Sequence, residues 1–229
     1  MNMRFGIFMA IFGIYTSIYA QKPRFTPQAH EIGIQLLGAN YFSKVADYQK
    51  DNTPFNLNFG NGIIYKYHLS LTDAVRIGVG WRNAAYEINE GIDRFASYQA
   101  DKQDLDISLG YERKLNLGPV QLFGGFLGIL GRGNVEDMGA LSATGDSYTG
   151  KYFYSNYGGA LFGGLRLFFS KNISLALEGQ GYYLQTRRQA APENTFYLFP
   201  ENELGYNANV YLSFHLVKMK KRCVCPARR

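Results

Sequence analysis

Residues 63–81 read IIYKYHLSLTDAVRIGVGW, two alternating segments joined by a short polar stretch. In each segment every second residue is apolar or aromatic, as in Ile63 and Tyr65 and again in Val79 and Trp81. The residues between them are polar, charged or small. Successive side chains of a β-strand point to opposite faces, so this period of two predicts a pair of antiparallel strands, each with one apolar face.

The same alternation recurs in eight segments from residue 30 onward. They cover residues 30–40, 59–69, 74–86, 102–114, 119–131, 154–169, 173–186 and 203–217. None of the apolar frames contains a charged residue, whereas the opposite frames carry glycines and charges such as Lys66 and Arg76. Segment 119–131 is ambiguous, because Phe123 and Leu127 make both of its frames apolar.

The connections between these segments alternate between short and long. The short ones are 70–73, 115–118 and 170–172, and the long ones are 41–58, 87–101, 132–153 and 187–202. Amphipathic strands of about ten residues with such connections are typical of a transmembrane β-barrel, with short periplasmic turns and long outer loops. We therefore predict an all-β, eight-stranded antiparallel up-and-down transmembrane barrel. Its even strand number places both termini in the periplasm.

The composition excludes two other classes of protein, a disordered chain and a helical membrane protein. The chain has 229 residues, of which 46% are hydrophobic and 16% aromatic, with 26 glycines, and a mean hydropathy of −0.20. A disordered chain has fewer apolar residues and more charge. A helical membrane protein needs longer apolar runs than this sequence has, since its one uninterrupted apolar stretch is N-terminal and short.

A secreted β-sandwich or lipocalin-like barrel would show the same alternation with the apolar face turned inward. Three features favour a bilayer. The polar frames are rich in glycine, which suits the interior of a narrow barrel. Charges are absent from the apolar frames, where a lysine or arginine near the midplane costs about 2–4 kcal/mol. Aromatic residues such as Trp81 and Tyr183 lie near predicted strand ends.

The two ends of the chain differ from its body. Residues 1–20 have Arg4, an apolar core and Ala20 at a small-residue boundary, as in a secretory signal peptide. Residues 21–217 form the predicted barrel, and residues 218–229 a basic periplasmic tail. The formal net charge of +6 resides in that tail and in Arg4, so nucleic acid is not predicted as a partner. Cys223 and Cys225 also lie in the tail, so disulfides do not hold the barrel together.

The leader, the eight strands and the unequal connections resemble the small outer-membrane barrel family typified by OmpX and the transmembrane domain of OmpA. The last strand is similar to the family's C-terminal assembly signal, which here comprises Gly205, Tyr206, Tyr211, Leu212 and Phe214. The resemblance implies insertion by the outer-membrane assembly machinery. This chain departs from the family by continuing past Phe214.

Charges on inward frames are the first candidate site. They are Lys66, Arg76, Asp106, Glu112, Arg166 and Glu178. An isolated buried charge is costly, so these groups must pair. We predict a structural ion-pair network that fills the lumen, because eight strands leave room for side chains and none for a channel. The alternative is a narrow, gated conduction path.

Catalytic and ligand sites have weaker support. His68 and Ser70 have the spacing of the histidine and serine of outer-membrane lipid A deacylases, and Ser213 and His215 repeat it in reverse. Both pairs fall at the periplasmic end, so no catalytic residues are assigned. The three histidines are scattered in the sequence, and no metal or cofactor site is predicted.

The predicted partners are outer-membrane lipid, lipopolysaccharide and the assembly machinery. The apolar residues 195–199 of the last long loop are expected to pack onto neighbouring loops, and the alternative is contact with lipopolysaccharide or a protein. The tail would contact an anionic cell-wall polymer or a protein. The predicted function is a non-enzymatic outer-membrane barrel that presents loops and supports the envelope. The alternatives are an accessory subunit of a secretion or assembly complex and a lipid A-modifying enzyme.

Overall fold

The computed structural model describes residues 29–42, 55–88, 95–118, 120–141, 145–189 and 201–216. The predicted signal peptide, the basic tail with its cysteines and the loop residues 195–199 lie outside the described residues. None of the described residues forms a helix long and apolar enough to cross a bilayer.

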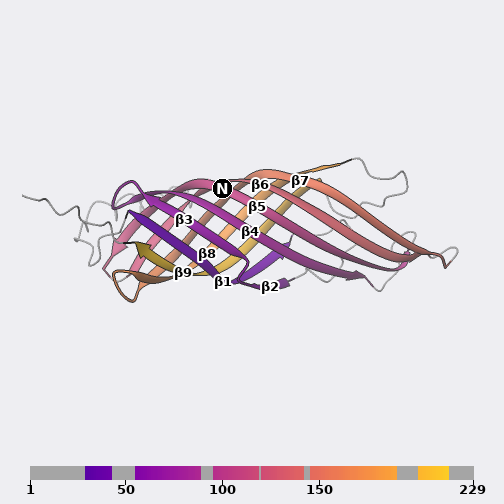
Figure 1. Cartoon of the computed structure of the whole chain (residues 1–229), viewed down its shortest axis with the longest axis horizontal. Helices are drawn as coiled ribbons and strands as arrows, with labels where there is room; N and C mark the ends of the chain where they lie inside the picture. Colours follow the sequence, from indigo (N-terminus) through magenta and orange to yellow (C-terminus); the bar gives the residue numbers. More distant parts are fainter. Residues whose placement is uncertain are drawn as a thin grey trace, which may run out of the picture.

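The described chain is a ring of antiparallel strands (Figure 1). The strands are β1 (His30–Phe42), β2 (Phe55–Phe59), β3 (Gly62–His68), β4 (Asp73–Ile88), β5 (Phe95–Leu117), β6 (Val120–Leu141), β7 (Ser147–Phe168), β8 (Ile173–Arg188) and β9 (Asn202–Leu216). From β3 to β9 each strand pairs with the next, and β1 pairs with β9 to close the ring. Both β2 and β3 pair with β1 on its other side, so they share one place in a ring of eight. The predicted eight-stranded barrel is confirmed.

The barrel wall is irregular where β2 meets β3. The chain turns there at Gly60, whose φ of 67° favours glycine. The β3–β4 ladder ends with Gly62 opposite Gly80, next to a hydrogen bond from the Trp81 backbone N–H to the Asn61 carbonyl. Beyond Gly80, β4 continues along β5, while β2 turns to pair with β1. Within the described ranges, no ladder joins β2 to β4.

Strands β5, β6 and β7 are much longer than predicted. The sequence assigned 87–101 and 132–153 to loops, whereas β5 begins at Phe95 and the β6–β7 connection covers only residues 142–146. These strands continue as what we call the outer extension, residues 95–104, 132–141 and 147–156 (Figure 1, right). There the outward residues are mostly polar and exposed, as are Gln99 and Gln103, so the apolar alternation that marked the strands is lost.

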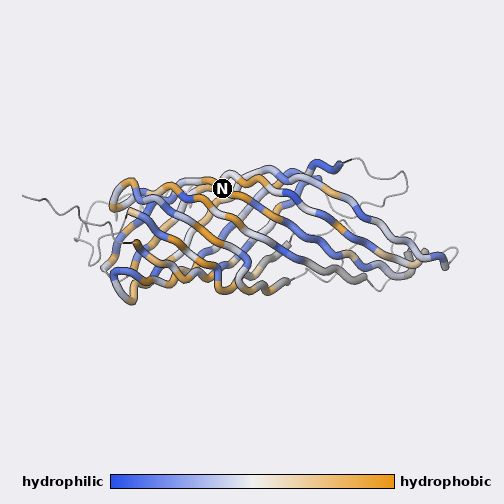
Figure 2. The backbone as a smooth tube through the Cα atoms, viewed as in Figure 1, coloured by the Kyte–Doolittle hydropathy of each residue, from blue (hydrophilic) through white to orange (hydrophobic). Residues whose placement is uncertain are grey.

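The polarity of the barrel is inverted relative to a water-soluble protein. An exposed apolar belt surrounds the half of the ring that contains His30 and Leu216, the first residue of β1 and the last of β9 (Figure 2). Its residues include Ile34, Ile63, Ile77, Ile107, Phe126, Leu161, Leu177 and Tyr206. The belt ends near Trp81, Leu130, Tyr157 and Tyr183, beyond which Gln103, Arg132 and Gln185 are exposed. Charged side chains lie inside the ring instead.

Strand β6, whose sequence was ambiguous, has apolar residues on both its lumen-facing side and its outward-facing side. Phe123, Leu127 and Ile129 are buried inside, where they pack with Phe162 of β7. Phe126 and Leu130 are exposed on the belt. The lumen of this barrel therefore contains a small apolar cluster as well as its charges.

Candidate functional site in the lumen

The inner face of the ring positions the predicted charges. Lys66 Nζ lies 2.5 Å from Glu112 Oε2. Arg76 donates two hydrogen bonds to Glu178, of 2.6 and 2.9 Å, and Arg166 Nη2 lies 3.6 Å from Glu112 Oε1. All five of these side chains are buried in the half of the barrel that contains His30 and Leu216, and we call their assembly the inner network.

Glu31 is the centre of the inner network, although the sequence did not single it out. Its carboxylate is fully buried and faces Arg166 Nη2 at 3.0 Å, Lys66 Nζ at 3.7 Å and His68 Nε2 at 3.1 Å. It directly precedes Ile32, the first residue of the apolar frame of segment 30–40. The alternation of apolar and polar residues in segment 30–40 places Glu31 on the inward face. Its contact with Arg166 of β7 arises only when the ring closes.

A second group of charges, the outer network, lies at the level of the outer extension. Asp106, the sixth predicted residue, belongs here and lies 2.8 Å from Arg82 Nη2. Lys102 Nζ lies 3.0 Å from Glu203 Oε2, and the Tyr182 hydroxyl donates to Glu203 at 2.9 Å. Lys102 and Glu203 were missed, because both lie at the edge of a predicted segment.

The two networks balance each other in formal charge. The cations are Lys66, Arg76, Arg82, Lys102, Lys114 and Arg166, and the acids are Glu31, Asp104, Asp106, Glu112, Glu178 and Glu203. Aromatic rings cover several of the cations, with the Arg76 guanidinium 4.3 Å from the centre of Phe162 and Lys66 Nζ 5.0 Å from that of Phe123. Pairing and ring contacts both offset the cost of burying these groups.

Two of the histidines, scattered in sequence, meet at Glu31. His68 Nε2 and His215 Nδ1 lie 3.1 and 3.8 Å from Glu31 Oε2, a donor set that Zn²⁺ accepts elsewhere. The side chains around these three groups do not suit a bound cation, because several of them are themselves positively charged. The Lys114 ammonium contacts His68 Nδ1, so Nδ1 accepts a hydrogen bond and Nε2 carries the proton donated to Glu31. A metal would need that nitrogen's lone pair, and it would stand beside Arg166 and Lys66.

The same corner contains a serine–histidine contact that the sequence did not reveal. Ser174 Oγ lies 2.7 Å from His215 Nε2, and His215 Nδ1 faces Glu31. This order of groups is that of a catalytic triad. Ser174 is fully buried, however, and the 3.8 Å gap to Glu31 is too long for a hydrogen bond. The geometry supports a packed polar corner rather than a nucleophile that a substrate can reach.

The serine–histidine spacings considered in the sequence do not form a site. His68 points into the inner network, whereas Ser70 lies in the β3–β4 turn and donates to Asp73 Oδ2 at 2.6 Å. Ser213 and His215 both point inward, and His215 contacts Ser174 instead.

The predicted assembly signal lies on β9, between β8 and β1. Tyr206 and Phe214 are exposed on the belt, Leu212 is half-buried there, and Tyr211 is buried inside. Gly205 lies inward, and a Cβ at this position would overlap the Tyr182 ring. The residues thus alternate as the signal requires, and their role in insertion stays a prediction.

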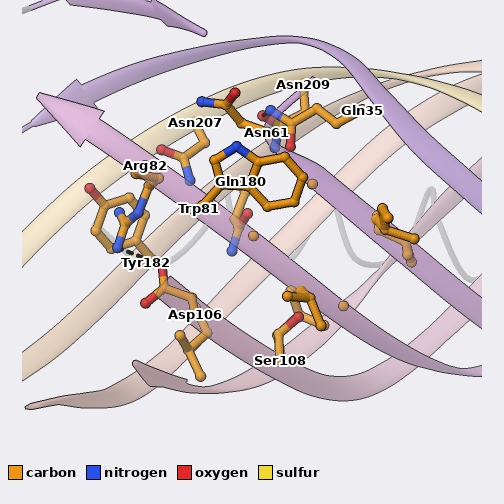
Figure 3. A pocket seen from close by; sticks show the side chains of 18 of the residues that line it. Gln35, Asn61, Trp81, Arg82, Asp106, Ser108, Gln180, Tyr182, Asn207 and Asn209 are labelled. Atoms are coloured by element: carbon orange, nitrogen blue, oxygen red, sulfur yellow. Dashed lines mark hydrogen bonds and ion pairs between the residues drawn. The ribbon is translucent and has the colours of Figure 1, made fainter. Parts of the chain in front are cut away.

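A cavity of about 100 Å³ lies between the two networks (Figure 3). Its polar lining comes from five strands and the β2–β3 junction and includes Gln35, Asn61, Ser108, Gln180, Asn207 and Asn209. Arg76 bounds it on the side of the inner network, and Arg82, Asp106 and Tyr182 bound it on the other.

Comparison with known proteins gives a likeness of fold. No family model matches the chain, and no curated protein matches it. Among solved structures, the attachment invasion locus protein Ail of Yersinia pestis is 13% identical, with a TM-score of 0.48 over 83% of this chain and 99% of Ail. Neisserial surface protein A is 9% identical, with a TM-score of 0.49 over 82% of this chain and 97% of that one. OprG of Pseudomonas aeruginosa is 9% identical, with a TM-score of 0.47 over 86% of this chain and all of OprG.

These three proteins are similar to the chain in architecture only. The predicted eight-stranded ring is shown by the strand pairing of the chain itself, and these likenesses give no information on ligands or partners.

Proposed function

We propose that this chain is a closed, non-enzymatic β-barrel of the bacterial outer membrane that supports the envelope and presents its outer extension at the cell surface. One observation carries the proposal. The side chains exposed around the ring form an apolar belt, while the twelve charged groups of the two networks lie inside. Water would penalise that arrangement, whereas hydrocarbon around the belt stabilises it.

The interior supports a structural role over conduction. The inner network spans the lumen from β1 to β7 through the Glu31–Arg166 pair, and from β4 to β8 through the Arg76–Glu178 pair. An ion could pass only if these buried pairs separated. Separating a buried pair leaves two uncompensated charges, at a cost of several kcal/mol.

The outer extension supports a role at the surface. Its outward face exposes polar side chains, including the Lys151–Glu136 ion pair, and it lies beyond the end of the belt that is opposite His30 and Leu216. With the termini in the periplasm, the extension would stand in the medium or among lipopolysaccharide headgroups. We propose these headgroups, the hydrocarbon around the belt and the assembly machinery as its partners in the envelope.

Extraction tests the location and the fold together. The full chain should be found in outer-membrane fractions, need detergent for release, and migrate differently in electrophoresis with and without boiling. External protease should cleave only outside the belt. Recovery as a folded, water-soluble protein without lipid or detergent would contradict the proposal.

A further inference from the structure

The cavity between the two networks differs from the rest of the lumen in the chemistry of its lining. Carboxamides converge on it from β1, β8, β9 and the β2–β3 junction, through Gln35, Gln180, Asn207, Asn209 and Asn61 (Figure 3). A carboxamide both donates and accepts hydrogen bonds. The charges at the two ends of the cavity are paired within the chain, so the lining as a whole suits an uncharged polar ligand.

Several polar atoms around the cavity have no hydrogen-bond partner. They are Asn207 Oδ1, Asp106 Oδ1 and Arg82 Nε. Gln35 and Asn209 do bond to each other, at 3.2 Å. Buried polar atoms are nearly always satisfied in folded proteins, so unpaired acceptors and a donor around one cavity point to something that satisfies them. One water occupies about 10–15 Å³ of such a cavity volume, so a cavity of about 100 Å³ holds several waters or one small ligand.

The wall of the cavity also includes residues of the belt. Ile63, Val79 and Trp81 belong to the exposed apolar belt, yet they line the same cavity. They lie where the β3–β4 ladder ends, beside Gly62 and Gly80, and Trp81 marks the outer edge of the belt. The cavity thus lies at the level where lipid headgroups would meet the medium, beside Trp81.

We propose that this cavity binds a single neutral, polyhydroxylated group, that is, one sugar unit. Hydroxyls that donate and accept match the carboxamides and the unpaired atoms, and an aromatic ring beside polar groups provides the amphipathic contact that a sugar ring needs. The sugar would come from a glycolipid headgroup at the membrane surface or from free saccharide. The inference goes beyond the proposed function, since the barrel needs no ligand to support the envelope.

Trp81 provides the measurement, because it is the only tryptophan of the chain. The full mature protein is folded in phosphocholine micelles, which contain no sugar. Its fluorescence is titrated with glucose, with N-acetylglucosamine and with octyl glucoside below its micelle concentration, and octyl phosphocholine serves as the chain-matched control. We expect a saturable change with at least one sugar probe. A response to octyl glucoside alone assigns the site to glycolipids, and a response to the free sugars assigns it to saccharides.

Gly80→Leu fills the cavity and has a matched control. Gly80 lines the cavity, and a Cβ at this position meets only the Asn61 carbonyl, at an ordinary contact distance of 3.6 Å. Gly179→Leu adds the same side chain on the lipid face, where the nearest atom lies 3.9 Å away. We expect Gly80→Leu to weaken sugar binding at least about tenfold, Asn207→Ala to weaken it as well, and Gly179→Leu to leave it unchanged.

Three results would overturn the proposal: no saturable change with any sugar probe, equal binding by Gly80→Leu, or an equal response to octyl phosphocholine and octyl glucoside. Both glycine variants are checked for the migration difference with and without boiling. That check separates a failure of the sugar site from a failure of the barrel itself.

Discussion

At the scale of single residues, buried ion pairs determine the energetics of the barrel interior. In the Arg76–Glu178 pair both side chains are at most 3% exposed, whereas in the Lys151–Glu136 pair on the outer extension both are more than half exposed. Removing one partner of a buried pair leaves the other charge unpaired in a medium of low dielectric constant. In an exposed pair, water and salt screen the charges. The same kind of contact therefore has very different energetic weight in the two places.

Glu178→Leu should lower the free energy of unfolding by about 3–5 kcal/mol, because it leaves the buried Arg76 guanidinium without its two hydrogen bonds and with only Glu112, 3.9 Å away, as an ion-pair partner. The double variant Arg76→Met/Glu178→Leu should recover most of that loss. Lys151→Ala, the control at the exposed pair, should cost no more than about 1 kcal/mol. Urea unfolding in micelles, followed by Trp81 fluorescence, measures all three. A Glu178→Leu protein as stable as the Lys151→Ala protein would contradict the network's structural role.

Asp137 gives a pH-dependent prediction in the outer extension. Burial raises the pKa of Asp137 above its ordinary value of 3.8, while a hydrogen bond from the Tyr98 hydroxyl, 2.7 Å long, acts in the opposite direction. A raised pKa in the folded state means that stability is complete below pH 3.8 and declines as the pH rises through the folded-state pKa.

Asp137→Asn should therefore protect the amides of residues 132–141 against hydrogen exchange at pH 7, and it should have no effect near pH 3. Exchange followed by mass spectrometry measures the difference. Lower protection of the variant at pH 7 would show that the ionised carboxylate stabilises the extension instead.

At the scale of elements, the sequence predicted the strands of the belt from their apolar outer face, except β2. Although Leu57 and Phe59 are exposed on that strand, most of it was taken for the loop 41–58. The six predicted lumen charges, from Lys66 to Glu178, lie inward as the alternation indicated. The outer extension was taken for loops because a strand with a polar outer face, as at Gln99 and Gln103, has no apolar period of two. Contacts such as Glu31 with His215 follow from the register of ring closure, which no local pattern contains.

Glycines that face the lumen allow neighbouring strands and side chains to approach closely, because they have no side chain of their own. A Cβ at Gly164 of β7 would lie 2.7 Å from Phe123 Cζ and closer still to the Leu177 carbonyl of β8. We expect Gly164→Ala to lower the free energy of unfolding by about 1–3 kcal/mol, since overpacking forces the strands or the ring to move. Gly179→Ala, with no neighbour nearer than 3.9 Å, is its control in the same urea titration. Equal midpoints for the two variants would refute this account of the packing.

At the scale of the whole molecule, the belt and the closed lumen each lead to a measurement. Ile107 lies in the belt on β5, between Leu105 and Leu109, and Gln103 lies beyond the edge of the belt on the same face. Ile107→Arg should cost about 2–4 kcal/mol of stability in lipid vesicles, and Gln103→Arg about 0–1 kcal/mol. Equal costs would mean that the belt does not face hydrocarbon.

The closed lumen predicts that the purified protein gives no stepwise conductance in planar bilayers. Arg76→Ala/Glu178→Ala removes two side chains that cross the interior and should produce small openings. Regular conductance steps from the unaltered chain at low voltage would favour the gated path over the structural network.

The place of Glu31 also has a consequence for how the barrel assembles. Its partners Lys66, Arg166 and His215 belong to β3, β7 and β9, so they are spread along nearly the whole described chain. A half-built sheet, with the β1–β9 seam still open, would leave this carboxylate short of counter-charges. Such intermediates are penalised until the last strand arrives, and contacts of such long sequence separation form slowly. Refolding into lipid should accordingly be slow and all-or-none, with the seam as its final step.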